Sequence, residues 1–220
     1  MQYRVAVEEL TALTDSIILL RTGKPVDYRF EPGQYAELAI DRPGFADETR
    51  PFSFTSRPDD RQLEFIFRSH HSHGGVTAEL ARLAPQSGLL LEEASGTIGY
   101  RGPGCFIAGG TGITPFLSIF RSHGAEPGFA GNRLLFSNKT EKDRFVTDEL
   151  LALFGDRVRF VVTHDPTSQC DSAFIDLEYL RPFVESDRHY YVCGPDDMVK
   201  EIVTALLALG VAEQYLVLEQ

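Results

Sequence analysis

The chain has 220 residues, of which 43% are hydrophobic, and its formal net charge is −11 at pH 7. This length allows one large domain or two domains of about 100 residues each, and the hydrophobic content is enough for a packed core rather than a disordered chain. The acidic balance argues against nucleic acid and against a polybasic membrane contact, because both require a basic protein surface.

The start of the chain, residues 1–20, has no basic leader followed by an apolar run, and no segment reaches the roughly 18 apolar residues of a membrane span. We therefore expect a cytoplasmic protein without a membrane span. The three cysteines, Cys105, Cys170 and Cys193, are spaced for neither a disulfide framework nor a zinc or iron–sulfur site.

The first half of the chain has short, often alternating apolar runs divided by turn residues. Strands are predicted at 3–10, 15–22, 33–40, 51–56, 62–68 and 89–94, with one short helix at 76–83. Short strands at this spacing are typical of a small all-β antiparallel barrel.

After residue 104, strands alternate with helices. The strands are predicted at 105–108, 133–137, 157–164, 189–194 and 215–219, and the helices at about 115–122, 141–153, 176–183 and 196–209. Thr140 and Asp143 have the spacing of a capping box. The alternation predicts an α/β parallel-sheet domain with helices on both faces, and the stretch GYRGPG, residues 99–104, marks the boundary between the halves.

The stretch CFIAGGTGITPF, residues 105–116, reads as a buried strand, a glycine-rich turn and the start of a helix. Gly110 and Gly112 fit the first two glycines of a dinucleotide fingerprint, whereas Pro115 occupies the place of the third. Thr114 is predicted to cap the helix, and free backbone N–H groups at its start would suit a phosphate. The alternative is an ordinary tight turn of an α/β domain.

Two further stretches, SNKTEKDR at 137–144 and CGPDDM at 193–198, also follow predicted strands. Ligands of open parallel sheets bind beyond the carboxyl ends of the strands. We therefore expect these two stretches and the glycine-rich turn to meet at one edge of the sheet.

The motifs RPFSFTS, GGTGITP and CGPDDM, in this order and preceded by EPGQYAELAI, resemble the ferredoxin–NADP reductase family. The resemblance covers nearly the whole chain. It implies a FAD-binding β-barrel domain at residues 1–101 and an NAD(P)-binding α/β domain at residues 102–220, without a fused iron–sulfur domain.

On the flavin side, the resemblance implies that Arg50 pairs with the flavin phosphate and that Ser53 lies near flavin N5. It implies that Phe52 packs on the isoalloxazine, at a position where relatives usually have tyrosine. Without the resemblance, Arg50 would be a solvated loop charge, and Phe52 and Phe54 core residues. The full set that the resemblance assigns to flavin binding is Arg50, Phe52, Ser53, Phe54, Thr55, Phe67, Arg68, Gly74, Gly75, Val76 and Thr77.

On the nucleotide side, the resemblance places Cys193 near the nicotinamide C4, and Ser137 and Lys139 at the adenosine ribose. Lys139 favours NADPH as the reductant, with NADH possible, because a 2′-phosphate needs positive charge. The alternative for Lys139 is a solvated charge at a helix start. The set assigned to nucleotide binding is Gly110, Thr111, Gly112, Thr114, Ser137, Lys139, Cys193, Gly194, Pro195 and Met198.

Catalytic roles fall by the same resemblance to Ser53, Cys193 and Glu219, the last in proton handling near flavin N5. Cys193 is expected to position the reactants rather than to act as a nucleophile, because its motif has no basic partner. Its alternative role is that of a small core residue, and Glu219 is equally well an ordinary strand-end carboxylate. Many relatives carry an aromatic residue after this glutamate. The resemblance therefore does not assign the residue that covers the flavin in this chain.

The histidines His70, His71 and His73 stand in one loop. No cysteine or paired carboxylate accompanies them at ligand spacing, so they are interpreted as loop histidines and no metal is expected.

The resemblance implies a flavin-dependent NAD(P)H oxidoreductase, with FAD as the family's usual flavin and FMN left open. Electrons would leave to a separate acceptor, either a protein such as ferredoxin or flavodoxin or a small molecule. The alternatives are a reductase of free flavin, ferric ion or quinone, a non-catalytic electron-transfer subunit, and a nucleotide-binding module that has lost its flavin.

Overall fold

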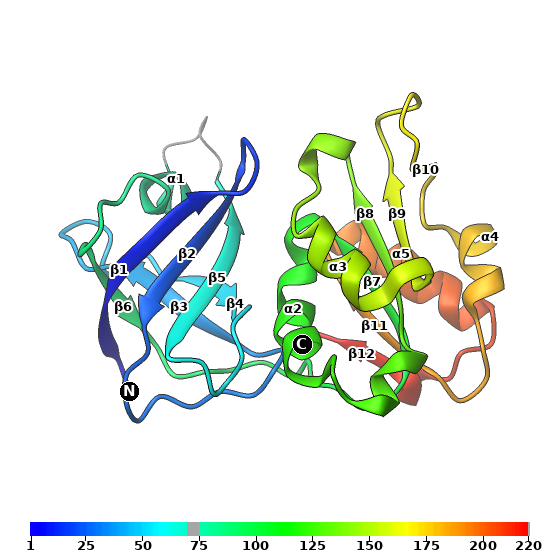
Figure 1. Cartoon of the computed structure of the whole chain (residues 1–220), viewed down its shortest axis with the longest axis horizontal. Helices are drawn as coiled ribbons and strands as arrows, with labels where there is room; N and C mark the ends of the chain where they lie inside the picture. The colour runs from blue at the N-terminus through cyan, green and yellow to red at the C-terminus, as the bar shows by residue number, and fades with distance from the viewer. Residues whose placement is uncertain (70–74, 220) are drawn as a thin grey trace. The chain divides into compact units, whose positions relative to one another are not determined.

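The computed structural model describes residues 1–69 and 75–219, which form two compact units. The first unit comprises Met1–Gly99 together with Thr114–Ser122, and the second comprises the rest of the chain. Figure 1 draws the strands of the first unit in blue to green and those of the second in green to red. Within the described ranges, no helix is both long enough and apolar enough to cross a membrane.

The first unit contains an antiparallel sheet with strand order β4-β3-β6-β1-β2-β5. Its elements are β1 (Tyr3–Ala12), β2 (Ile17–Gly23), β3 (Tyr35–Ile40), β4 (Arg50–Ser53), β5 (Gln62–Arg68), α1 (Val76–Leu80) and β6 (Gly88–Leu91). Phe54, directly after β4, forms an antiparallel bridge with Phe65 of β5, so the two edge strands meet. The sheet is therefore a nearly closed barrel, as the sequence predicts.

The interior of the barrel is aromatic. Phe54 is fully buried and stacks on Phe30 with ring centroids 4.0 Å apart, and it also contacts Phe65 at 5.2 Å. On β5, alternation sends Leu63 and Phe65 into this core and leaves Glu64 on the outer face. Each buried ring contributes roughly 2–3 kcal/mol to folding through the apolar surface that it removes from water.

The second unit contains a parallel sheet with strand order β10-β9-β8-β7-β11-β12. Its strands are β7 (Gly104–Gly109), β8 (Arg133–Asn138), β9 (Val158–Val162), β10 (Asp171–Ser172), β11 (His189–Cys193) and β12 (Leu216–Leu218), and its helices are α3 (Thr147–Phe154), α4 (Leu177–Leu180) and α5 (Asp196–Ala208). A further helix, α2 (Thr114–His123), follows β7, and all of it except its last residue groups with the barrel.

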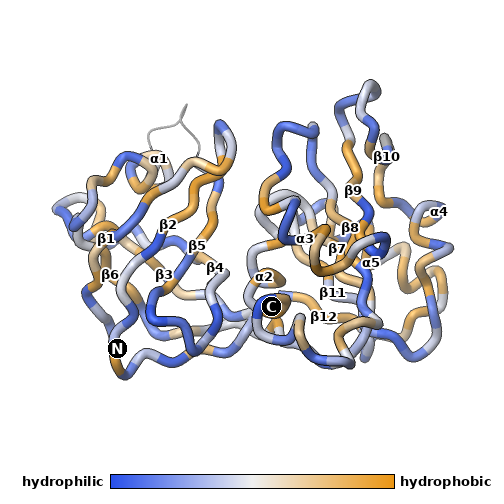
Figure 2. Tube along the Cα trace, viewed as in Figure 1, coloured by the Kyte–Doolittle hydropathy of each residue, from blue (hydrophilic) through white to orange (hydrophobic). Residues whose placement is uncertain are grey.

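The parallel sheet is apolar on both faces, and Figure 2 shows hydrophobic residues concentrated along its strands. Ile107 packs on one face with residues of α4 and α5. Its neighbour Phe106 faces the other side, where it stacks on Tyr191 at 4.1 Å and contacts Phe129. Phe129 in turn contacts Phe154 of α3. Helices thus cover both faces, as expected for a parallel sheet.

The predicted helix at 141–153 is wrong in its first part. The capping box of Thr140 and Asp143 forms, but it encloses only a 3₁₀ turn over Glu141–Asp143. The chain then leaves the helical region, and Val146 adopts the left-handed conformation with φ 50° before α3 begins at Thr147. The backbone at Val146 breaks the helix that the apolar periodicity suggests.

Other boundaries differ for local reasons. The helix predicted at 176–183 divides into α4 and a 3₁₀ turn over Arg181–Phe183, because Pro182 lacks the N–H that would continue the α-helix. Thr114 is the first residue of α2 rather than the residue before it, since a 3₁₀ turn over Gly110–Ile113 leads into the helix. The two-residue strand β10 is too short to leave a period in the sequence.

The strained backbone at Val146 gives a stability prediction. A β-branched residue in the left-handed region costs about 1–2 kcal/mol, whereas asparagine tolerates it. We expect Val146→Asn to raise the free energy of unfolding by about 1 kcal/mol, measured by urea denaturation. Val184, equally half-buried but with φ −84°, is the matched control. A similar gain in Val184→Asn would show that backbone strain is not the cause.

Candidate functional site

The strand β4 carries the RPFS part of the flavin motif. Arg50 begins it, and the side chain is 48% exposed. Its Nη1 donates to the carbonyl of Thr49 at 2.6 Å, and its Nη2 lies 3.2 Å from the carboxylate of Glu48. A guanidinium has five N–H donors. Arg50 therefore retains the capacity to hold a phosphate at the surface of the barrel.

The aromatic residues of the motif lie inside the barrel. Phe52 is 7% exposed and meets Phe67 edge to face at 5.5 Å, while Phe54 is fully buried. Both are predicted as flavin contacts, yet alternation along the strand turns them to the core side, and the ring of Phe54 is wholly enclosed by core residues. Ser53 lies between them, opposite Tyr35 on β3, and stays partly exposed.

A second guanidinium lies at the same end of the barrel as Arg50. Because β4 and β5 meet as antiparallel strands, the start of β4 and the end of β5 lie together. Arg68 ends β5, and its Nη1 donates to the hydroxyl of Ser16 at 2.8 Å. Arg50 and Arg68 are therefore two separate candidate donors for the diphosphate of FAD, each with a partner of its own.

The second predicted phosphate segment is only partly described. Gly74 lies outside the described residues, as do the histidines set aside as metal ligands. Gly75 precedes α1, and a Cβ there would meet no atom of the described residues within 4 Å. Val76 is buried as the first residue of α1, followed by a half-buried Thr77. The sequence correctly predicts a helix start here.

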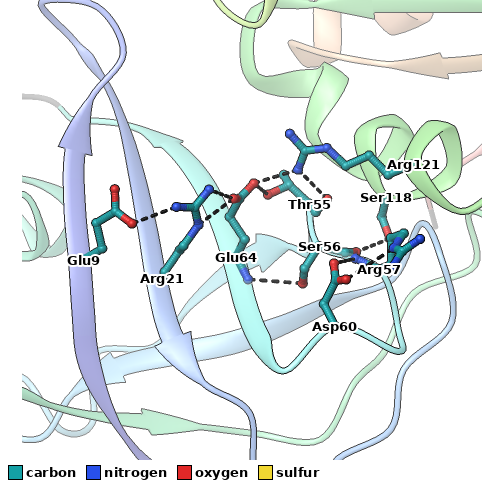
Figure 3. Close-up of polar contacts among 9 residues, drawn as sticks. All are labelled: Glu9, Arg21, Thr55, Ser56, Arg57, Asp60, Glu64, Ser118 and Arg121. Atoms are coloured by element: carbon teal, nitrogen blue, oxygen red, sulfur yellow. Dashed lines mark hydrogen bonds and ion pairs between the residues drawn. The ribbon is translucent and has the colours of Figure 1, made fainter. Parts of the chain in front are cut away.

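Thr55 uses its hydroxyl inside the barrel unit. It is fully buried and donates to Oε1 of Glu64 at 2.8 Å (Figure 3). Burial opposes ionisation of this carboxyl, but Arg121 and Arg21 donate to it and hold its pKa below the ordinary value. The side chain of Thr55 is therefore committed to Glu64, and its main-chain N–H and carbonyl are paired as well, with the carbonyl of Glu64 and with Nη1 of Arg121.

In the second unit, the three predicted stretches meet at the carboxyl edge of the sheet. Gly109 at the end of β7 pairs with Ser137 on β8, and Ala108 pairs with Cys193 on β11. These registers bring the three stretches to one edge, as the sequence predicts, and place the glycine-rich turn between the other two.

The glycines of the turn are required by close packing. A Cβ on Gly112 would overlap the carbonyl of Cys193 and the Cα of Gly194, and a Cβ on Gly109 would overlap the sulfur of Met198. Gly110 has φ +54°, which L side chains rarely adopt. Two predicted nucleotide-binding segments are thus in main-chain contact. Met198 is the third residue of α5, which begins at Asp196, the first residue of the predicted helix.

Cys193 is a neutral thiol. Burial raises its pKa to about 12, and the nearby charge of Glu219 adds to the effect. Glu219 is exposed as a residue, but neighbouring atoms displace part of the water around its carboxyl and raise its pKa as well. The expectation that Cys193 is no nucleophile agrees with this, because only the thiolate attacks.

At the end of β8, Ser137 is nearly buried and Lys139 is exposed. Arg144 lies further along, with its guanidinium 4.9 Å from the ring centroid of Phe160 and its Nη1 donating to Sγ of Cys170 at 3.1 Å. Lys139 is thus more accessible than Arg144, and Lys142 is exposed as well.

The sequence reasoning missed Asn138, although an asparagine closing an apolar strand was the available signal. The residue is 4% exposed, and neither Oδ1 nor Nδ2 has a hydrogen-bond partner among the described residues. An unpaired buried amide costs about 1–3 kcal/mol, so native proteins rarely leave one without a reason. Its place at the carboxyl edge, beside Ser137, suits a polar ligand.

The pairing of Cys193 with Glu219 gives a testable reactivity. Removing the negative charge lowers the thiol pKa, so Glu219→Gln should speed alkylation of Cys193 by iodoacetamide at pH 8.5 severalfold. The rate is followed by mass spectrometry of the intact, folded protein. Glu213→Gln, an exposed change just before β12, is the control and should leave the rate unchanged. Equal rates in wild type and Glu219→Gln would contradict the electrostatic effect.

Both units match family models. The FAD-binding domain model matches residues 2–103, and the oxidoreductase NAD-binding domain model matches residues 106–204. The structure is similar to that of a ferredoxin NADP⁺ reductase from Neisseria gonorrhoeae with bound FAD and NADP, with a TM-score of 0.86 at 22% identity over 99% of this chain and 97% of that one. At this identity the likeness supports the fold.

Among curated proteins, the reductase component of the naphthalene 1,2-dioxygenase system of Pseudomonas putida is 28% identical over 96% of this chain and 66% of its own length. The anthranilate 1,2-dioxygenase electron transfer component of Acinetobacter baylyi is 30% identical over 96% and 64%. The chain thus spans slightly less than two thirds of these relatives.

Ferredoxin–NADP reductase B of Sorangium cellulosum is 30% identical, and the match covers 89% of this chain and 86% of that protein. With the barrel, the parallel sheet and the two domain matches, this shows that the chain belongs to the ferredoxin–NADP reductase family.

Proposed function

We propose that the chain is an NAD(P)H-dependent flavoprotein reductase that passes electrons to a separate acceptor, such as a ferredoxin or a flavodoxin. The main support is the contact of the Gly109–Gly112 turn with Cys193 and Gly194 at the carboxyl edge of the sheet. That edge is where parallel-sheet domains bind nucleotides, and the first unit matches a FAD-binding domain.

When bound, FAD supplies the redox chemistry, taking a hydride from NAD(P)H, which becomes NAD(P)⁺, and giving two electrons to the acceptor while the proton goes to solvent. Arg50 and Arg68 are proposed to hold its diphosphate, and the half-exposed hydroxyl of Ser53 to hydrogen-bond the flavin ring. Phe52 is proposed to contact the flavin through the small part of its ring that the core leaves exposed. These roles rest on the family resemblance together with the exposure and position of each residue.

On the nucleotide side, the turn that contains Gly110 and Gly112 is proposed to hold the pyrophosphate. Cys193 is proposed to place the nicotinamide as an uncharged thiol, and Lys139 to favour NADPH over NADH. An exposed lysine supports the choice of NADPH, because a 2′-phosphate needs a cation that can move to meet it. Asn138 adds a buried amide to which a bound polar group would supply a hydrogen-bond partner.

We further propose domains at 1–101 and 102–220, in support of which the family models end and begin at residues 103 and 106. A cytoplasmic location stays a prediction from the sequence. A second function is an electron-transfer component of an oxygenase system, which the names of the Pseudomonas and Acinetobacter relatives favour. Slow reduction of small acceptors, with fast reduction of a co-purifying protein, would distinguish this role.

The first test is the visible absorption spectrum of the purified protein, followed without oxygen as NADPH or NADH is added. We expect a flavin band that bleaches within seconds and faster bleaching with NADPH. A protein that stays colourless after incubation with FAD would contradict the proposal. A faster reaction with NADH would reverse the role proposed for Lys139.

The second test concerns Arg50. We expect Arg50→Ala to lower the flavin retained after gel filtration at least tenfold, because a phosphate contact to a guanidinium contributes about 1.5–3 kcal/mol. Arg57→Ala is the matched control, since Arg57 is also 48% exposed and paired with a nearby carboxylate, Asp60. Full flavin content in Arg50→Ala would remove Arg50 from the site.

A further inference from the structure

Helix α2 is hydrogen-bonded to the main chain of the last two residues of the flavin motif, Thr55 and Ser56. The hydroxyl of Ser118 donates to the carbonyl of Ser56 at 2.7 Å, and Nη1 of Arg121 donates to the carbonyl of Thr55 at 2.7 Å. Ser118 is fully buried. Figure 3 shows both side chains reaching from α2 to this segment, which begins two residues after Ser53.

The same guanidinium forms an ion pair with a buried carboxylate on the outer face of the barrel. Oε1 of Glu64 lies 2.6 Å from Nη1 of Arg121 and accepts from the hydroxyl of Thr55 at 2.8 Å. Oε2 accepts from Nε of Arg21 at 2.9 Å. Both oxygens of Glu64 are therefore paired, and the donors come from β2, α2 and the segment after β4.

The burial of Glu64 is unusual for its position. The side chain is 8% exposed, although the outer face of an antiparallel strand normally meets water. Arg121 is itself only 23% exposed. A buried ion pair adds little net stability, but leaving one partner alone is strongly unfavourable. Such a pair fixes one arrangement of α2 on the barrel more than it strengthens the fold.

Helix α2 is continuous in sequence with the nucleotide-binding turn. Thr114, the first residue of α2, directly follows the Gly110–Ile113 turn that packs on Cys193. Ser118 and Arg121 therefore hold a helix whose first residue comes directly after this turn.

We propose that Glu64 and Arg121 are positioning residues for hydride transfer, which hold α2 against the end of the flavin motif and so fix the main chain that follows Ser53. This inference rests on the proposed reductase function. Neither residue needs to touch the flavin or the nucleotide, so neither is a catalytic residue. Their effect should appear in the rate of the chemical step rather than in the binding of either group.

The test is anaerobic stopped-flow reduction of the flavin-loaded protein by NADPH. At saturating NADPH we expect Glu64→Gln and Arg121→Met to lower the rate constant at least tenfold. Flavin content and the apparent Kd for NADPH should stay within twofold of wild type. The double variant should be no slower than the slower single variant, because both changes remove the same contact.

Three further variants separate positioning from general damage. Glu9→Gln removes only the far end of the network, where Glu9 pairs with Arg21 at 2.7 Å, and should stay within twofold of wild type. Arg121→Lys keeps the charge and should stay within threefold. Ser118→Ala removes only the hydroxyl that donates to the Ser56 carbonyl and should slow flavin reduction severalfold. This variant replaces Arg121→Met in the test if Arg121→Met does not fold.

Wild-type rates in folded Glu64→Gln and Arg121→Met, or in Ser118→Ala where these do not fold, would overturn the inference. Loss of bound flavin in step with the rate would overturn it as well, because it would show support of the flavin site instead. If wild type itself is not reduced by NADPH or NADH, the proposed function fails first and the inference fails with it.

Discussion

No side chain fits between the glycine-rich turn and the segment that follows β11. A Cβ at Gly112 would occupy the space of the Cys193 carbonyl, so the two main chains touch. The strands β7 and β11 already pair in parallel up to Ala108 and Cys193, and this contact extends their approach beyond the strand ends. Because the turn carries glycines, no side-chain bulk stands between the two main chains at the carboxyl edge of the sheet.

The barrel depends on a different constraint, the balance of charge around Glu64. Burial disfavours its charged form, while Arg121, Arg21 and the hydroxyl of Thr55 favour it, and the net result is a lowered pKa. The contribution to stability is therefore full above the ordinary carboxyl pKa and is lost as pH falls through the lowered value. Glu9 on β1 pairs with Arg21, so the network of charged side chains reaches from the buried Glu64 to the surface.

The strands could be predicted because apolar alternation and turn residues record them, and the meeting of GGTGITP with CGPDDM followed from strand order. Features that depend on a single backbone dihedral, or on a partner far away in the sequence, could not be predicted. The apolar pattern around Val146 continues through the point where the backbone breaks the helix. The commitment of Thr55 to Glu64 depends on a strand that pairs only in the fold, whereas residue type alone already offered Phe52 and Phe54 as core residues. Within the motifs, chemistry was readable from residue type, but exposure was not.

If the proposed nucleotide supplies a partner to the amide of Asn138, its binding is coupled to folding. The amide has no partner among the described residues, and a polar partner would be worth about 1–3 kcal/mol to it. A ligand that supplies the partner binds only to the folded chain and recovers that free energy, which corresponds to roughly 5- to 150-fold in affinity. The folded population then rises with ligand concentration. Nucleotide supply would thereby set how long the polypeptide survives proteolysis, in addition to how fast it turns over.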